Sequence, residues 1–204
     1  MYVPGNMQMA STEQAQAFVD QFGFGVLVSE PLQGSHLPFL LNRSEGHSGT
    51  LYSHFAKANP HWQDLDGKEV LIIFSGPHSY ISPTWYAAAP AVPTWNYAAV
   101  HAYGVVRLLD GPRTLEVVEQ TVAKYEPELL AKRDILTDAF RDRLLAGIVG
   151  FKVELSRLEG KLKLGQHRKP ADQQGVWQGL QASDDLQAQA LAQYMARVQL
   201  GTGQ

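Results

Sequence analysis

The sequence predicts a mainly β fold with peripheral helices, of the α+β class, built as a closed or split barrel of six or seven strands. Short apolar stretches that alternate with polar residues recur along the chain, as half-buried strands do. The helical stretches between them fall at intervals too irregular for a repeating strand–helix–strand sheet. With 45% hydrophobic and 18% charged residues among 204, the chain has enough apolar side chains for a core.

The first half of the chain is predicted to form one helix and then a series of strands. The helix begins after the capping residue Ser11 and ends at Gly23. A helical turn over 54–59 ends at Pro60, and the Gly76-Pro77 pair is expected to break the chain. Strands are expected over 24–28, 37–41, 50–53, 70–74 and 80–81.

The second half carries the strongest strand pattern, over 94–109, where Trp95, Tyr97 and Tyr103 share one side of the strand. Gly104 within it indicates a bulge or strong coiling. Helices are expected over 115–125, 134–146 and 183–198, with a strand over 149–155. We therefore expect one barrel domain over residues 1–180 and a C-terminal amphipathic helix, within 181–204, packed on it.

Several classes of protein are excluded or disfavoured. The absence of cysteine excludes disulfide scaffolds and thiol nucleophiles. The seven histidines show no metal-binding spacing, and no serine nucleophile motif is present, so neither a metal site nor a catalytic residue is predicted. With no export signal and no stretch of eighteen apolar residues, a cytoplasmic protein without membrane contact is expected.

A first candidate site lies where a strand is followed by a helical turn, at His54, Lys57 and Asn59. Lys57 and Lys68 are the only Lys or Arg residues between positions 46 and 106. Unpaired backbone N–H groups at a helix start favour anions, so a phosphate site is one interpretation. A surface lysine beside a histidine is the other.

A second candidate site is rich in aromatic residues. Seven of the twenty aromatic residues lie between Phe74 and Tyr103, interspersed with polar ones. Flat rings among hydroxyl and amide groups suit a planar heterocycle. A barrel core is an equally good explanation, because Trp and Tyr are common in strands.

A third candidate site is the basic segment 152–169, which contains six Lys or Arg and two Glu residues in a chain of net charge −3. Such a segment could bind the phosphate of a cofactor or a nucleic-acid backbone. It could also be a solvated basic face.

Several stretches in order resemble the PaiB-type FMN-binding negative transcriptional regulator family. They are Met1-Tyr2-Val3-Pro4, His36-Leu37-Pro38, His54-Phe-Ala-Lys-Ala-Asn59-Pro60-His-Trp62, Phe74-x-Gly76-Pro77-His78-x-Tyr80-Ile81-Ser82-Pro83-x-Trp85-Tyr86, Val92-Pro93-Thr94-Trp95-Asn96-Tyr97, Ile148-Val149-Gly150-Phe151 and Gly160-Lys161-x-Lys163-Leu164-x-Gln166. The likeness covers about residues 1 to 180. It departs from the family where Lys57 replaces an arginine, and where Gly165 and His167 replace serine and asparagine.

The resemblance implies a pyridoxamine-phosphate-oxidase-like split barrel, a homodimer that holds FMN at the subunit interface, and a role in transcription. His54, Lys57 and Asn59 would then lie near the phosphate. Further cofactor contacts are expected from Ser82, Thr94 and Asn96 as polar groups, from Trp85 and Tyr97 as ring walls, and from Lys163 and Gln166. DNA contact, if direct, would use segment 152–169. A flavin-dependent oxidoreductase and a dimer without flavin are the alternatives.

Overall fold

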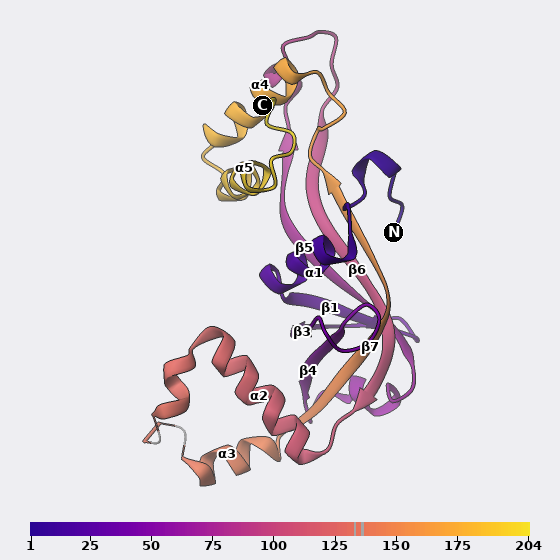
Figure 1. Cartoon of the computed structure of the whole chain (residues 1–204), viewed down its shortest axis with the longest axis vertical. Coiled ribbons are helices and arrows are strands. Elements are labelled where there is room, and N and C mark those ends of the chain that lie inside the picture. The colour runs from indigo at the N-terminus through magenta and orange to yellow at the C-terminus, as the bar shows by residue number, and fades with distance from the viewer. Residues whose placement is uncertain (133, 136) are drawn as a thin grey trace. The chain divides into compact units, whose positions relative to one another are not determined.

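We describe residues 1–132, 134–135 and 137–204 in a computed structural model, without the side chains of residues 138–140 and 142. Within this described part, seven strands form one sheet in the order β2-β1-β5-β6-β7-β4-β3 (Figure 1). The strands are β1 (Phe24–Ser29), β2 (Gln33–Pro38), β3 (Leu40–Asn42), β4 (Thr50–Ala56), β5 (Glu69–Ile81), β6 (Thr94–Leu108) and β7 (Ile148–Lys163). The α-helices are α1 (Thr12–Gln21), α2 (Gly111–Tyr125), α3 (Asp138–Leu145), α4 (Pro170–Gln181) and α5 (Leu186–Val198). Short 3-10 turns are η1 (Gly5–Met7), η2 (Pro60–Asp64), η3 (Pro83–Trp85) and η4 (Pro127–Ala131).

The chain divides into two compact units. The terminal unit comprises residues 1–11, 75–100 and 159–204, and the central unit comprises 12–74 and 101–158. Strands β5, β6 and β7 each run from one unit into the other, because the divisions fall inside them. The domain boundary expected at residue 180 stays a prediction.

The central unit is built around four phenylalanines. Phe39, Phe55, Phe74 and Phe151 are all at most 1% exposed. The Phe55 ring stacks on Phe151 at 4.8 Å between centres, and Phe39 meets Phe74 edge-on at 5.6 Å. Such arrangements add to the stability that burial provides. Phe55, Phe74 and Phe151 lie on β4, β5 and β7, and Phe39 lies between β2 and β3. The antiparallel pairs β1–β2, β1–β5, β3–β4 and β4–β7 join these strands.

Gly104 allows β6 and β7 to approach closely within the central unit. A Cβ atom at this position would lie 2.4 Å from the carbonyl oxygen of Glu154, closer than two such atoms can come. The glycine predicted to mark a bulge or strong coiling therefore marks a close approach of two neighbouring backbones.

The terminal unit contains the ends of β5, β6 and β7 together with helices α4 and α5, which lie beside each other (Figure 1). Its fully buried side chains include Ile81, Leu164 and Leu180. Helix α4 was not predicted, because its apolar residues are few and it contains glycines, which disfavour helix.

The helices α1, α2 and α5 and the strands β1 and β6 match the sequence-based predictions. Of the helix expected over 134–146, residue 136 lies outside the described residues, and α3 covers 138–145. The apolar run 37–41 is divided between β2 and β3 rather than forming one strand. The predicted class, mainly β with peripheral helices and six to seven strands, is confirmed.

Two predicted interruptions are wrong. Strand β4 continues to Ala56, where a helical turn was expected, because Phe55 is fully buried and Ala56 still pairs with Ile148 of β7. Strand β5 runs through the Gly76-Pro77 pair. Before the pair the buried residues of β5 have even numbers (70, 72 and 74), and from Pro77 on they have odd numbers (77, 79 and 81). A β-bulge, which inserts one extra residue into a strand, produces this shift. Strand β7 is also longer than the predicted 149–155.

No helix within the described residues combines the length and the apolar composition that a membrane span requires.

Candidate functional site

The terminal-unit part of β6 has one buried and one open side. Asn96, Ala98 and Val100 are at most 2% exposed, whereas Trp95 is 48% exposed and Tyr97 is half-buried. Successive side chains of a strand point to opposite faces, so Trp95 and Tyr97 share the open side. These two rings are therefore not part of the core of this chain, which disfavours the barrel-core interpretation for this part of the aromatic cluster.

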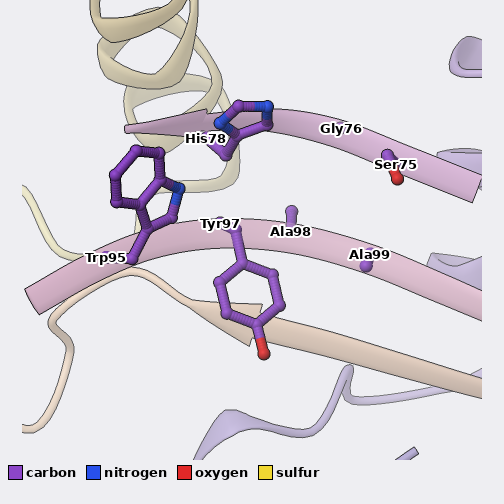
Figure 2. Close-up of a pocket in the computed structure, with 7 residues that line it drawn as sticks. All are labelled: Ser75, Gly76, His78, Trp95, Tyr97, Ala98 and Ala99. Atoms are coloured by element: carbon purple, nitrogen blue, oxygen red, sulfur yellow. The ribbon is translucent and has the colours of Figure 1, made fainter. Parts of the chain in front are cut away.

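A shallow pocket of about 250 Å³ lies on this open side (Figure 2). It is lined by Ser75, Gly76 and His78 of β5 and by Trp95, Tyr97, Ala98 and Ala99 of β6. The Trp95 ring lies 5.9 Å from His78 and meets Tyr80 edge-on at 6.4 Å. Figure 2 shows Trp95 turned toward His78 of β5, whereas the Tyr97 ring extends toward the neighbouring strand β7. The pocket thus presents flat faces on which a ring system can stack.

Two lysines of β7 adjoin the Tyr97 side of this pocket. The Lys161 ammonium nitrogen lies 5.3 Å from the centre of the Tyr97 ring. Lys163 Nζ donates a hydrogen bond of 2.7 Å to Thr94 Oγ1. Residues two apart on a strand share a side, so β7 carries both cations on one side. Rings, a hydroxyl and two positive charges therefore come together in the terminal unit.

Three other predicted residues of the terminal unit serve local structure. Ser82 Oγ accepts a hydrogen bond from the backbone N–H of Thr84 at the start of η3. Trp85 packs on α4, where a Cβ at Gly179 would lie 2.4 Å from its indole. Gln166 Nε2 donates to the carbonyl oxygens of Asn6 at 2.9 Å and Leu162 at 2.6 Å, and its Oε1 accepts from the Leu164 N–H. Their predicted cofactor contacts stay predictions.

Gly165, which stands where the resembling family has serine, has a φ of +80°. Only glycine adopts this left-handed backbone without strain. Glycine therefore suits the turn that follows β7 in this chain.

The remaining predicted residues, His54, Lys57 and Asn59, lie in the central unit at the end of β4 and before η2. Asn59 Oδ1 accepts a 3.0 Å hydrogen bond from the His61 backbone N–H, and Asn59 Nδ2 donates to Ser35 Oγ at 3.2 Å. The indole N–H of Trp62 donates to the Lys57 carbonyl oxygen at 3.1 Å. The turn is thus fixed from several sides, while the Lys57 side chain is exposed and makes no hydrogen bond or ion pair with the described residues.

A buried histidine supports this turn. His61 is 4% exposed, and its two ring nitrogens lie 2.8 Å from the hydroxyl oxygens of Ser29 and Ser35. Burial lowers the pKa of both His61 and His54 below the ordinary value of 6.5. Both rings are therefore neutral at pH 7, so His54 can offer an anion a hydrogen bond but no charge.

The structure groups the predicted residues in two sets. Thr94, Tyr97 and Lys163 lie on neighbouring strands of the terminal unit, where Asn96 faces the buried side of β6, and His54, Lys57 and Asn59 lie on one turn of the central unit. The terminal-unit pocket also contains His78 and Trp95, with Lys161 beside it, which the prediction did not include. The alternation along 94–109, which places Trp95 beside Tyr97, was the signal that could have added Trp95.

Comparison with known proteins decides the family. The family model described as "Putative FMN-binding domain" matches residues 1–157 of this chain. The chain belongs to this family. It is 34% identical, over 204 residues and 96% of each chain, to the Bacillus subtilis "Protease synthase and sporulation protein PAI 2". An Emericella nidulans protein named "Uncharacterized protein AN0679" is 29% identical, with 74% of this chain and 75% of its own length covered.

Solved structures share the fold at low sequence identity. The flavocytochrome Anf3 of Azotobacter vinelandii superposes with a TM-score of 0.61 and 13% identity, over 80% of this chain and 73% of its own. The FAD and heme binding protein of Mycobacterium smegmatis gives a TM-score of 0.58 at 13% identity, over 78% and 74%. The predicted family, the split-barrel fold and FMN as the cofactor are confirmed.

The residues of the terminal unit fit FMN. Its isoalloxazine is a flat ring system, for which Trp95 and Tyr97 provide stacking faces, and its phosphate is an anion, for which Lys163 provides a cation. When bound, FMN would supply the flavin's electron-transfer chemistry. Among the described residues, no group of three or more His, Asp or Glu side chains is arranged to hold a metal ion.

Proposed function

We propose that this chain is an FMN-binding protein that acts as a homodimer and as a negative transcriptional regulator in the cytoplasm. The observation that carries the flavin part is the open aromatic side of β6, where Trp95 is 48% exposed above a hollow of about 250 Å³. The regulatory part is supported by the Bacillus subtilis relative, whose name concerns protease synthesis and sporulation.

In the proposed complex the isoalloxazine ring stacks against Tyr97, with Trp95 and His78 beside it. Thr94, Asn96 and Ser82 supply polar contacts, and Trp85 lines the ring farther along. Lys163, at the end of β7, and Gln166, after it, contribute to phosphate binding, and Lys57, with His54 and Asn59, is a separate candidate phosphate site on the central unit. Lys57 suits this role because its ammonium is exposed on a turn that hydrogen bonds hold rigid.

A second copy of the chain completes the site in this proposal. The hollow of about 250 Å³ is below the roughly 300–1,000 Å³ typical of small-molecule sites, so one chain supplies only part of the walls. Tyr80 and Trp95 are each 48% exposed on neighbouring strands, and exposed aromatic side chains are typical of protein interfaces. A homodimer would cover them and enclose the flavin.

Flavin titration tests the site directly. Wild-type protein should bind FMN saturably, and Lys57→Ala and Lys163→Ala should each weaken binding about tenfold by removing a charge-assisted contact. Trp95→Ala should weaken it by a similar factor, whereas Tyr125→Ala, which truncates an exposed ring in the central unit, should not. Unchanged affinity in both lysine variants would remove the phosphate assignment, and no saturable binding by the wild type would remove the proposed cofactor site.

Direct DNA contact through segment 152–169 is the less supported part of the regulatory proposal, because most of its cations are engaged. Lys152 forms ion pairs with Glu45 at 3.3 Å and Glu154 at 2.9 Å. The Arg157 guanidinium lies 3.9 Å from the Tyr103 ring centre, and Arg168 lies 4.7 Å from that of Tyr86. A gel shift at low salt with promoter and random DNA tests whether the protein binds DNA directly. Binding to neither would mean that regulation is indirect.

A flavin-dependent oxidoreductase is the second candidate. His78 favours it, because an imidazole in the pocket wall could exchange a proton with a bound flavin or substrate. Oxidation of NADH or NADPH by the FMN-loaded protein would support this function. A third possibility, a dimer without flavin, predicts a colourless protein that does not change the absorbance spectrum of added FMN.

A further inference from the structure

Lys161 of β7 is a buried ammonium group without an acidic partner. The residue is 7% exposed, and no carboxylate of the described residues lies within ion-pair distance of it. Its Nζ donates one hydrogen bond, of 3.0 Å, to the carbonyl oxygen of Tyr2. The same nitrogen lies 5.4 Å and 5.3 Å from the ring centres of Tyr2 and Tyr97.

These contacts leave the charge uncompensated. Lysine is almost never buried unless it is paired, because removing an ion from water is costly. A carbonyl oxygen and two aromatic faces are neutral groups that stabilise a cation only partly. An ammonium has three N–H donors, and one is used here. The nearby acid on the same strand, Glu159, pairs with the amino group of Met1 instead.

A second cation lies next to it on the same side of β7. Lys163 Nζ is 2.7 Å from Thr94 Oγ1, and Thr94 is three residues before Tyr97 on β6. Because Tyr97 also lines the aromatic pocket, the two ammonium groups border the proposed flavin site. A phosphate monoester carries about 1.5 to 2 negative charges at pH 7, which two lysines match.

We propose that Lys161 is a direct ligand of a phosphate monoester, namely the 5′-phosphate of FMN, and that Lys163 supports it from two residues along the strand. This inference rests on the proposed function, since it assumes that the flavin occupies the pocket of Figure 2. The same chemistry would also attract free inorganic phosphate, so the test separates the two sources.

The experiment compares FMN with riboflavin, which lacks the phosphate. Dissociation constants of both are measured by flavin fluorescence for the wild type, Lys161→Met, Lys161→Arg and the control Lys68→Met. Methionine keeps an unbranched apolar chain and removes the charge, and Lys68 is an exposed lysine of the central unit. We expect Lys161→Met to weaken FMN binding about tenfold or more with riboflavin binding unchanged, and Lys161→Arg to retain most of the preference for FMN.

Several results would overturn the inference while leaving the proposed function intact. In the first, the wild type binds FMN, and Lys161→Met prefers FMN over riboflavin as strongly as the control Lys68→Met does. The second is an equal loss of FMN and riboflavin affinity, which would assign Lys161 to the pocket wall. The third is an unchanged preference with a loss of dimer mass, which would mean that an acid of a second copy pairs with Lys161.

Melting temperatures measured with and without inorganic phosphate test whether the site binds free phosphate instead. If the wild type binds no flavin, the proposed function fails, and the FMN assignment of Lys161 fails with it. Phosphate that then stabilises the wild type but not Lys161→Met would show a site for free phosphate in place of the flavin phosphate. If Lys161→Met does not fold, the test uses Lys163→Met and Lys161→Arg, and the preference of each variant for FMN over riboflavin is measured. A shared phosphate site is contradicted if Lys163→Met keeps the wild-type preference and Lys161→Arg shows no preference.

Discussion

At the scale of single residues, His61 shows how a buried polar group can fix a site it does not enter. Its ring joins the hydroxyls of Ser29 and Ser35, and Ser35 in turn accepts from Asn59. Two of the three links join residues more than 25 positions apart in the sequence. The turn that carries Lys57 is therefore held by β1 and β2, and not only by its own residues.

The lowered pKa of His61 makes a pH-dependent stability expected. Because the unfolded chain takes up this proton near pH 6.5 and the folded chain does so only at lower pH, the free energy of unfolding should fall as pH drops below about 6.5. His61→Gln should show a smaller fall between about pH 7 and pH 5.5, and a loss of about 1–3 kcal/mol at pH 7 from the altered buried hydrogen bonds. Urea unfolding measures both, and an equal pH dependence in the two proteins would contradict this role of His61.

Which candidate residues could be predicted from sequence depends on where their partners lie. Lys163 and Thr94 were selected by residue type and position in a motif, and the structure brings them together. Gln166 was selected in the same way, yet its amide is occupied by Asn6, 160 residues away. No local pattern contains that contact. Lys161 was overlooked because a lysine in a basic segment is expected to be solvated, and only the fold shows that it is buried.

At the scale of elements, α4 packs on η3 through glycines. A Cβ atom at Gly175 would lie 2.1 Å from the carbonyl oxygen of Trp85, and one at Gly179 would lie 2.4 Å from its indole. The same glycines weaken the helical pattern, which is why α4 was not predicted. Strand β6, in contrast, was predicted almost to the residue, because alternation over fifteen residues is a strong signal.

Gly175→Ala tests this packing. In an open helix the change would stabilise by about 1 kcal/mol, but here the new methyl group meets backbone and should cost more than that gain. We expect a melting temperature several degrees below that of the wild type. Gly111→Ala is the matched control, since no atom lies within 4 Å of a Cβ at that helix start. Equal melting temperatures for the two variants would show that α4 does not rest closely on Trp85.

At the scale of the whole molecule, the proposed account requires two copies of the chain. Light scattering should give twice the 22.5 kDa mass of one chain. Trp95→Asp should shift the mass toward that of a single chain, because a carboxylate on the open side of β6 would be desolvated in the interface. The exposed Leu32→Asp, in the central unit, serves as a control of the same charge. A monomeric wild type would contradict the shared site.

The fold class and the family could both be predicted from the sequence, whereas the assembly of the site could not. Alternation and motif order specify which strands exist and which residues they carry. They do not specify that β5, β6 and β7 each pass through two compact units, with Lys57 in one and Lys163 in the other. That division follows from long-range pairing, which depends on contacts between residues as distant as Gln8 and Lys161.

The most direct test of the central claim is a crystal structure of the protein grown with FMN. The account predicts two copies in contact, with the isoalloxazine against Tyr97 and Trp95 and the phosphate within hydrogen-bond distance of a lysine ammonium. FMN bound at another surface, or an aromatic side of β6 that stays bare while flavin saturates the crystal, would contradict it.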